Sequence, residues 1–240
     1  MNSRPLPQSL AGLLLAVFIF AGGGVSAGPQ TDDLTAQAQQ GKEAMAAGRF
    51  DDAVTHYAAI VQALPNEAGM RLNLGMALSM AGRPREAVPQ LQAALKLRPD
   101  LLPASLFLGA AQVELGQPAK AVEHLETFVA AQPDHRDARQ MLAETLLSLE
   151  RHEQAARQYR VLTDQGPQDP KAWYGLGKSY EGLSQRAFET LQTSAPESPY
   201  LLLLVAQGMV AQERDKGAGT GPRSSSPGRT TPSGLAGPGP

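Results

Sequence analysis

The stretch GMALSMAGRPREAVPQLQAALKLRP, from Gly75 to Pro99, decides the fold because its small and apolar residues return further along the chain at a fixed distance. Each returns 34 residues later (109 − 75 = 34, 133 − 99 = 34). The recurring positions are Gly75, Gly82, Ala87, Leu91, Ala94 and Pro99, followed by Gly109, Gly116, Ala121, Leu125, Phe128 and Pro133.

This spacing predicts two short helices joined by a tight turn. Gly82 follows an apolar run, and glycine is favoured just past the C-terminus of a helix. Pro84 suits the first turn of the next helix, where the missing N–H has no partner to lose. Gly75 and Ala87 are small enough to let two antiparallel helices approach closely. A helix pair this short cannot bury its apolar face alone, so neighbouring copies must stack.

Copies of the pattern extend in both directions. Upstream they give Gly41, Gly48, Ala53, Tyr57, Ile60 and Pro65; downstream they give Ala143, Ala155, Tyr159, Leu162 and Pro167, and then Trp173, Leu176, Gly177 and Tyr180. A 34-residue period with small residues at fixed offsets and a closing proline resembles the tetratricopeptide repeat, a helix–turn–helix unit. The resemblance covers residues 34–214 and implies an all-α, right-handed α-solenoid of about five repeats. The residues expected to hold its helices together are Gly41, Ala53, Gly75, Ala87, Gly109, Ala121, Ala143, Ala155 and Gly177.

The expected boundaries follow from the period. Repeats 1 to 5 span 34–67, 68–101, 102–135, 136–169 and 170–198, and a terminal helix follows at 199–214. Repeat 4 has Glu150 in place of the turn glycine, and the second helix of repeat 5 starts early, at Gln185 or Arg186. Residues 28–33 are expected to form a polar linker. The Gly-, Ser- and Pro-rich stretch 215–240 is expected to be a disordered tail, because it cannot bury enough apolar surface to order itself.

Residues 1–27 have the layout of a secretory signal peptide. Arg4 supplies a positive start, Leu10 to Ala21 is an uninterrupted small and apolar run, and small residues precede a cleavage point after Ala27. This predicts export to the periplasm or cell envelope. An uncleaved membrane anchor is the alternative, although the strongly hydrophobic part is short for a bilayer span.

The composition excludes several kinds of chemistry. The chain has no cysteine and a net charge of −2, so it offers neither thiolate chemistry nor a basic excess for nucleic acid. Gly177-Lys178-Ser179 resembles the end of a phosphate-binding loop, but Ala172 stands where the motif requires glycine. The histidines lack metal-ligand spacing and are expected to be solvated at the surface. We predict no active site, no metal and no cofactor.

The family resemblance implies a partner-binding groove lined by the first helix of each repeat. The expected groove residues are Leu72, Asn73, Met76, Met80, Leu106, Phe107, Ala110, Val113, Gln140, Met141, Glu144, Leu147, Tyr174 and Lys178, with Glu181 beside them. Some family members hold a partner's C-terminal carboxylate with a set of Lys, Asn and Arg residues, of which only Asn73 is present here. An apolar or amphipathic segment of a protein is therefore the expected ligand. The competing interpretation is that several of these residues pack the superhelix.

The function that follows is a non-enzymatic, exported scaffold for protein–protein interaction. An accessory or truncated repeat arm of a larger envelope enzyme or assembly complex is the alternative. Self-association is a third possibility, because the terminal helix carries apolar residues on more than one face between Leu201 and Val210. A membrane is expected as a partner only where residues 1–27 stay attached.

Overall fold

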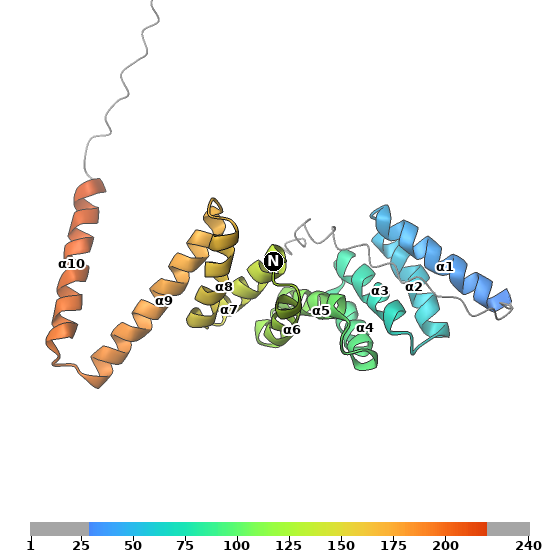
Figure 1. The fold of residues 1–240 in the computed structure, drawn as a ribbon, viewed down its shortest axis with the longest axis horizontal. Coiled ribbons are helices and arrows are strands. Elements are labelled where there is room, and N and C mark those ends of the chain that lie inside the picture. Colours follow the sequence, from blue (N-terminus) through green and yellow to red (C-terminus); the bar gives the residue numbers. More distant parts are fainter. Residues whose placement is uncertain (1–28, 220–240) are drawn as a thin grey trace, which may run out of the picture. The chain divides into compact units, whose positions relative to one another are not determined.

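The computed structural model describes residues 29–219, with side chains from 33 to 210, and every regular element in this range is an α-helix (Figure 1). The expected signal peptide at 1–27 and the end of the tail at 220–240 lie outside the described residues. The helices are α1 (Pro29–Ala46), α2 (Phe50–Ala63), α3 (Ala68–Met80), α4 (Pro84–Leu97), α5 (Leu102–Glu114), α6 (Pro118–Ala131), α7 (Arg136–Ser148), α8 (His152–Gln165), α9 (Pro170–Ser194) and α10 (Pro199–Gly219).

The first eight helices form four helix–turn–helix repeats, as the period predicts. The turns of repeats 1 to 3 contain Gly48, Gly82 and Gly116, with φ angles of 70°, 71° and 69°. This left-handed conformation is the one that glycine adopts without a steric penalty. Repeat 4 makes the same turn with Glu150 at φ 56°. The turn geometry is therefore kept even where its preferred residue is missing.

Small residues let the two helices of a repeat pack closely. A Cβ atom built on Gly75 would lie 2.6 Å from the Leu91 side chain, and one on Gly109 would lie 2.8 Å from Leu125. Both distances are too short for real side chains, so a larger residue would push the helices apart. The alanines at the facing position of each second helix are fully buried: Ala53, Ala87, Ala121 and Ala155.

Consecutive repeats are joined along their first helices. Helix α3 contacts α5, and α5 contacts α7, in addition to the packing of each helix on the next from α1 to α8. One polar contact returns at each of three boundaries. Arg71 donates to the Pro65 carbonyl at 2.6 Å, Arg139 to the Pro133 carbonyl at 2.7 Å, and Trp173 to the Pro167 carbonyl at 2.9 Å. We call these three hydrogen bonds the boundary clasps.

Repeat 5 differs from the expectation of a fifth hairpin. Helix α9 is a single helix of 25 residues that continues through Ser184, the position where the other repeats turn. Ser184 stands at the place of the turn glycine and Arg186 at the place of Pro84 and Pro118, but these changes alone do not abolish the turn, since repeat 4 turns with Glu150 and His152 at the same places. The stretch is also two residues shorter than in repeat 2, because Gly177 and Ala187 are ten residues apart whereas Gly75 and Ala87 are twelve apart.

The ends of the helical region also differ from the expected boundaries. Helix α1 begins at Pro29, inside the stretch expected to be a linker, because proline is well suited to the first turn of a helix. Helix α10 continues to Gly219, five residues into the expected tail, 215–240 (219 − 215 + 1 = 5). The chain divides into two compact units, Met1–Ser184 and Gln185–Pro240. In the second, α10 exposes apolar side chains: Tyr200, Leu202, Leu203, Leu204, Val205, Met209 and Val210.

Candidate functional site

The first helices place only part of the expected groove within reach of a partner. Five expected residues are buried: Leu72, Met76, Leu106, Phe107 and Ala110. Phe107 is only 1% exposed. The prediction that these residues line an open apolar trough is wrong, because neighbouring first helices pack against each other and cover them.

The remaining expected groove residues are accessible. Met80, Val113, Met141 and Leu147 are half-buried apolar side chains on α3, α5 and α7, with Asn73 and Gln140 beside them; Glu144, Tyr174, Lys178 and Glu181 are exposed. We call the four half-buried apolar residues the apolar set. Their partial exposure, next to amide and carboxylate groups, suits a ligand that is apolar on one side and polar on the other.

Polar contacts orient the side chains at the α7–α9 end of this surface. Gln140 donates to Glu144 at 2.7 Å, and Lys171 of the next repeat forms an ion pair with the same carboxylate at 2.9 Å. Lys178 pairs with Glu181 at 2.5 Å, and this hydrogen bond raises the pKa of Lys178. Sequence reasoning missed the part played by Lys171, although its charge, opposite to that of Glu144, was the available signal.

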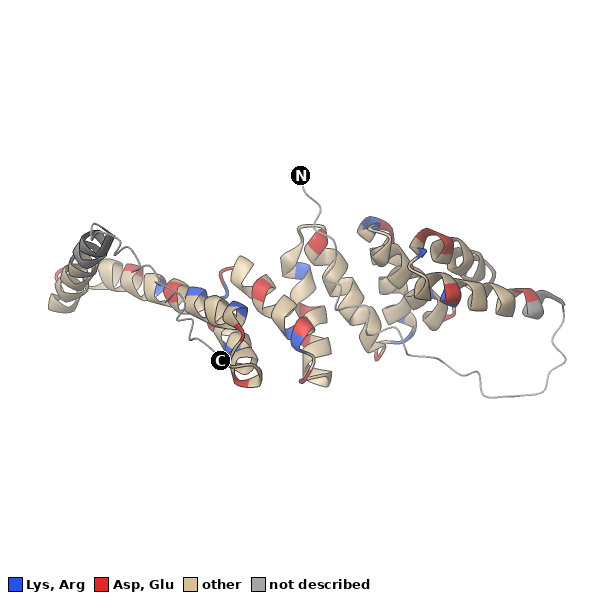
Figure 2. Cartoon of the chain, turned by 90° about the horizontal axis from the view of Figure 1, so that it is seen from above, with Lys and Arg blue, Asp and Glu red and all other residues tan. Residues whose placement is uncertain are grey.

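Charge is mixed along the described helices. Figure 2 shows acidic and basic residues interspersed, without a long stripe of one sign in the coloured part of the chain. At the edge of the apolar set, burial raises the pKa of the Glu114 carboxyl on α5. The surface therefore offers local polar contacts rather than a field of one sign.

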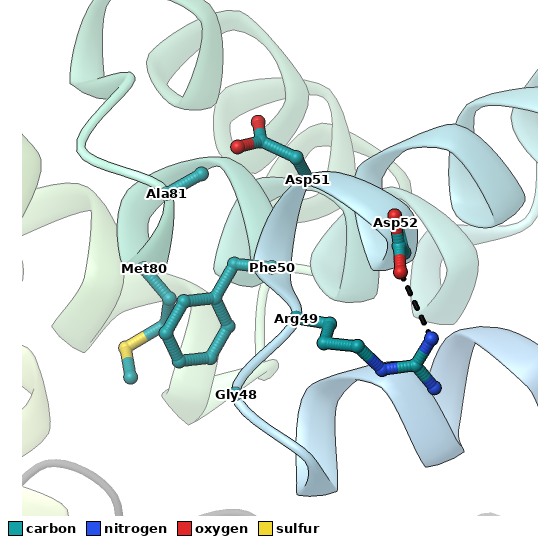
Figure 3. A pocket seen from close by; sticks show the side chains of 7 residues that line it. All are labelled: Gly48, Arg49, Phe50, Asp51, Asp52, Met80 and Ala81. Carbon is teal, nitrogen blue, oxygen red and sulfur yellow. Dashed lines mark hydrogen bonds and ion pairs between the residues drawn. The ribbon is translucent and has the colours of Figure 1, made fainter.

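A hollow of about 390 Å³ lies where the first turn meets the end of α3. Figure 3 shows the Phe50 and Met80 side chains next to each other, with Asp51 above them and Asp52 turned toward Arg49. Both carboxylates have partners, since Asp52 pairs with Arg49 at 2.9 Å and Asp51 with Arg83 at 3.3 Å. Of the lining residues only Met80 was expected at the site, because the hollow is formed by a turn rather than by a periodic helix face.

The expectation of solvated histidines is wrong, since all four are half-buried. His56 pairs with Gln37 at 2.7 Å, and the His135 ring accepts a hydrogen bond from the Ala138 amide at the start of α7. Among the residues described, no group of three His, Asp or Glu side chains is placed to hold a metal ion. Over the same residues, no helix is long and apolar enough to cross a membrane.

The segment that resembled a phosphate-binding loop is part of a helix. Ser179 is fully buried and donates to the Gly175 carbonyl at 2.8 Å, one helical turn back. Gly177 is exposed, and a Cβ there would meet nothing within 4 Å. The close approach expected at Gly177 is absent because α9 has no second helix folded against it.

Two family models, both described as tetratricopeptide repeat, match the chain. One matches residues 78–135 and 112–178, and the other matches residues 39–101. Together they span 39–178, which is 140 of the 240 residues (178 − 39 + 1 = 140). The chain belongs to the tetratricopeptide repeat (TPR) family.

Solved structures share this TPR fold. A crystal structure of MamA protein is 23% identical, with a TM-score of 0.59 over 70% of this chain and 96% of that one. MamA residues 41 to the end from Desulfovibrio magneticus RS-1 is 21% identical, with a TM-score of 0.55 over 70% and 98%. YrrB, described as a TPR protein with an unusual peptide-binding site, is 18% identical, with a TM-score of 0.60 over 74% and 94%. At these identities the likeness shows the fold alone.

A comparison with curated protein sequences finds no match to this TPR chain.

Proposed function

We propose that the chain is a non-enzymatic scaffold that binds an amphipathic segment of another protein across α3, α5 and α7. The observation that carries the proposal is the apolar set, which stays accessible on first helices that pack side by side. Half-exposed Met and Val side chains adapt to apolar ligands. The Asn73, Gln140 and Glu144 side chains would meet the polar side of the same segment.

Site-specific photo-crosslinking tests this assignment and identifies the ligand. A photoreactive residue at Val113 or Met141 should trap one protein at one segment, whereas the same residue at Glu123 or Arg157, exposed on second helices, should not. Equal trapping at all four positions would contradict the proposal, because it would mean that the ligand does not prefer the first helices to the second.

The trapped segment, made as a peptide, then allows affinity to be measured. The double variant Met80→Glu, Met141→Glu should bind it at least about tenfold more weakly, since two carboxylates would be desolvated against apolar side chains. Thr55→Glu with Thr127→Glu, on second helices, is the matched control. Unchanged affinity in the groove variant, with normal helicity, would contradict the proposal. Phe107→Glu is unsuitable, because a charge at a buried position would unfold the repeat.

We also propose that the protein works in the periplasm or cell envelope after cleavage following Ala27, on the basis of the charged start, the apolar run and the small residues before the cleavage point. N-terminal sequencing of the protein from its native cells should begin at Gly28. A sequence that begins at Met1 would support the membrane-anchored alternative.

The alternative function, an accessory arm of a larger envelope enzyme or assembly complex, is favoured by one observation. Helix α10 exposes seven large apolar side chains, and the last helix of a repeat array normally has a polar outer face. Purification from native envelopes separates the two proposals. A stoichiometric complex that survives the Met80→Glu, Met141→Glu change would favour the accessory arm.

A further inference from the structure

One face of α9 is exposed, whereas the equivalent face of the first helix in repeats 2 to 4 is buried. In repeats 2 to 4, the eighth and eleventh residues of the first helix are buried: Gly75 and Leu78, Gly109 and Gln112, Ala143 and Leu146. The equivalent residues of α9 are Gly177, which is exposed, and Tyr180, which is 41% exposed. Trp173, one turn earlier, is 51% exposed, whereas its equivalent Arg139 is 8% exposed.

This face continues along the whole helix and is exposed except at Leu191, which is half-buried. The residues that form it alternate in steps of four and three: Trp173, Gly177, Tyr180, Ser184, Ala187, Leu191 and Ser194. We call these seven residues the α9 seam. Such alternation keeps one stripe of a helix facing a partner helix, and small residues within the stripe permit a close approach.

The second half of the seam has the pattern of a missing second helix. Ala187, Leu191 and Ser194 repeat the spacing of Ala87, Leu91 and Ala94, which are fully buried in repeat 2. In that repeat Leu91 fills the space beside Gly75. The corresponding glycine of α9, Gly177, has nothing beside it. The chain therefore carries both halves of a helix pair, but they lie in one uninterrupted helix and cannot pair with each other.

We propose that two copies of the chain pair antiparallel through the α9 seam, so that residues 185–194 of each copy cover residues 170–184 of the other. The contact that Gly75 makes with Leu91 inside repeat 2 would have an equivalent between copies, with Gly177 of one copy against Leu191 of its partner. Residue 184 is midway between 177 and 191, so the two-fold axis passes near Ser184. This is an exchange of an identical element between protomers, which makes a closed dimer with a self-complementary interface.

A second copy fits the seam better than an unrelated helix for two reasons. Its residues 185–194 carry the alanine, leucine and serine at the spacing that the first half requires. Pairing between copies also requires no turn, in keeping with the uninterrupted helix α9. The seam contains none of the residues of the apolar set, so the variants that test dimer formation leave the proposed ligand-binding residues unchanged.

A cysteine placed on the axis tests the pairing directly, because the chain has no other cysteine. Oxidised full-length Ser184→Cys should give at least about tenfold more disulfide-linked dimer than Arg186→Cys, since residue 186 lies about 200° round the helix from residue 184. Similar yields from the two variants would overturn the proposed axis.

Sedimentation of the full-length protein provides the second test. The parent should dimerise, and Gly177→Glu should weaken dimerisation at least about tenfold by placing a carboxylate against Leu191 of the partner. The monomer should keep its helicity, because there is open space at Gly177. Trp173, the only tryptophan, should become less accessible to quencher as the parent concentration rises.

Two results would overturn the pairing. One is a parent that stays monomeric throughout the concentration series, which would leave the seam to a different protein. The other is a dimer that Gly177→Glu does not weaken, which would place the contact elsewhere, for instance on α10.

Discussion

Repeat 2 and repeat 5 share the family's small and apolar positions at the start, Leu74-Gly75 and Leu176-Gly177, and end in different structures. Each has a glycine at the eighth position, and each is followed by an alanine and a leucine four residues apart. In repeat 2 the chain turns at Gly82 and buries Leu91, whereas in repeat 5 it continues as a helix through Ser184. The comparison shows that the helix faces specify what can pair, and the turn decides whether the pair forms within one chain.

Truncating the leucine that fills the space between the two helices of a repeat should have the largest effect on stability. Leu91→Ala leaves a cavity at a fully buried position beside Gly75, and we expect a loss of about 3 kcal/mol of folding free energy. Leu191→Ala, at the equivalent position of α9, is only partly buried and should cost about 1 kcal/mol or less. Denaturation followed by far-UV circular dichroism in dilute solution measures both. Equal losses would mean that the second helix of repeat 5 is packed as tightly as that of repeat 2.

Two glycines within α9 distinguish its closed face from its seam. A Cβ on Gly175 would lie 2.2 Å from the Tyr159 ring, so Gly175→Ala should destabilise the array by about 2 kcal/mol through overpacking. In solution dilute enough to keep the chain monomeric, Gly177→Ala has room and should stabilise the helix by about 1 kcal/mol, since alanine is the better helix former. Melting temperatures that move in opposite directions would support the difference. A drop for both variants would show that the seam is already covered within one chain.

The turn of repeat 4 is intermediate between the glycine turn of repeat 2 and the missing turn of repeat 5, because it forms without a glycine. Glu150 adopts φ 56°, a conformation that strains residues other than glycine. Glu150→Gly should therefore stabilise the protein by about 1 kcal/mol, and Gly82→Ala in repeat 2 should destabilise it by a similar amount. Thermal unfolding of the two variants is the measurement. A destabilised Glu150→Gly would show that contacts of the glutamate side chain outweigh the strain.

The smallest expected effect is a dependence on pH in repeat 3. Burial lowers the pKa of His124, against a smaller opposing effect of the Glu123 carboxylate. The unfolded chain then binds the proton more readily, so stability should fall as the pH drops through the ordinary histidine value, about 6.5, and stop falling below the folded-state pKa. His124→Gln introduces a glutamine, which repeats 2 and 4 have at the equivalent positions, Gln90 and Gln158. Melting temperatures between pH 8 and pH 5 should vary less in this variant, and an unaltered profile would assign the dependence to other groups.

The helical repeats could be predicted from the sequence because their signals are local and repeated. Gly48, Gly82 and Gly116 each ended a helix where the period placed them. The single helix α9 was not predicted, because the resemblance of Trp173, Leu176 and Gly177 to the family pattern suggested a complete repeat. The visible signal against a complete repeat was the two-residue shortening after Gly177, which repeats 1 to 4 do not have.

The candidate site was predicted only in part, because position within a repeat does not fix exposure. Phe107 and Met141 are both the sixth residue of their repeats and were both expected in the groove, yet the first is buried and the second is half-buried. Burial depends on how closely the neighbouring first helices approach, which is a property of the stack and not of one repeat. The exposed Tyr174 and Lys178 were predicted more easily, since no complete repeat follows to cover them.

The boundary clasps have a consequence for how such a chain changes over evolution. Each one joins a side chain to a carbonyl only six residues earlier, so these three contacts are set by a short stretch of chain. A duplicated module that includes both the closing proline and the start of the next first helix would carry its clasp with it. The packing of one first helix on the next, as of α3 on α5 and of α5 on α7, would still have to form at each new junction.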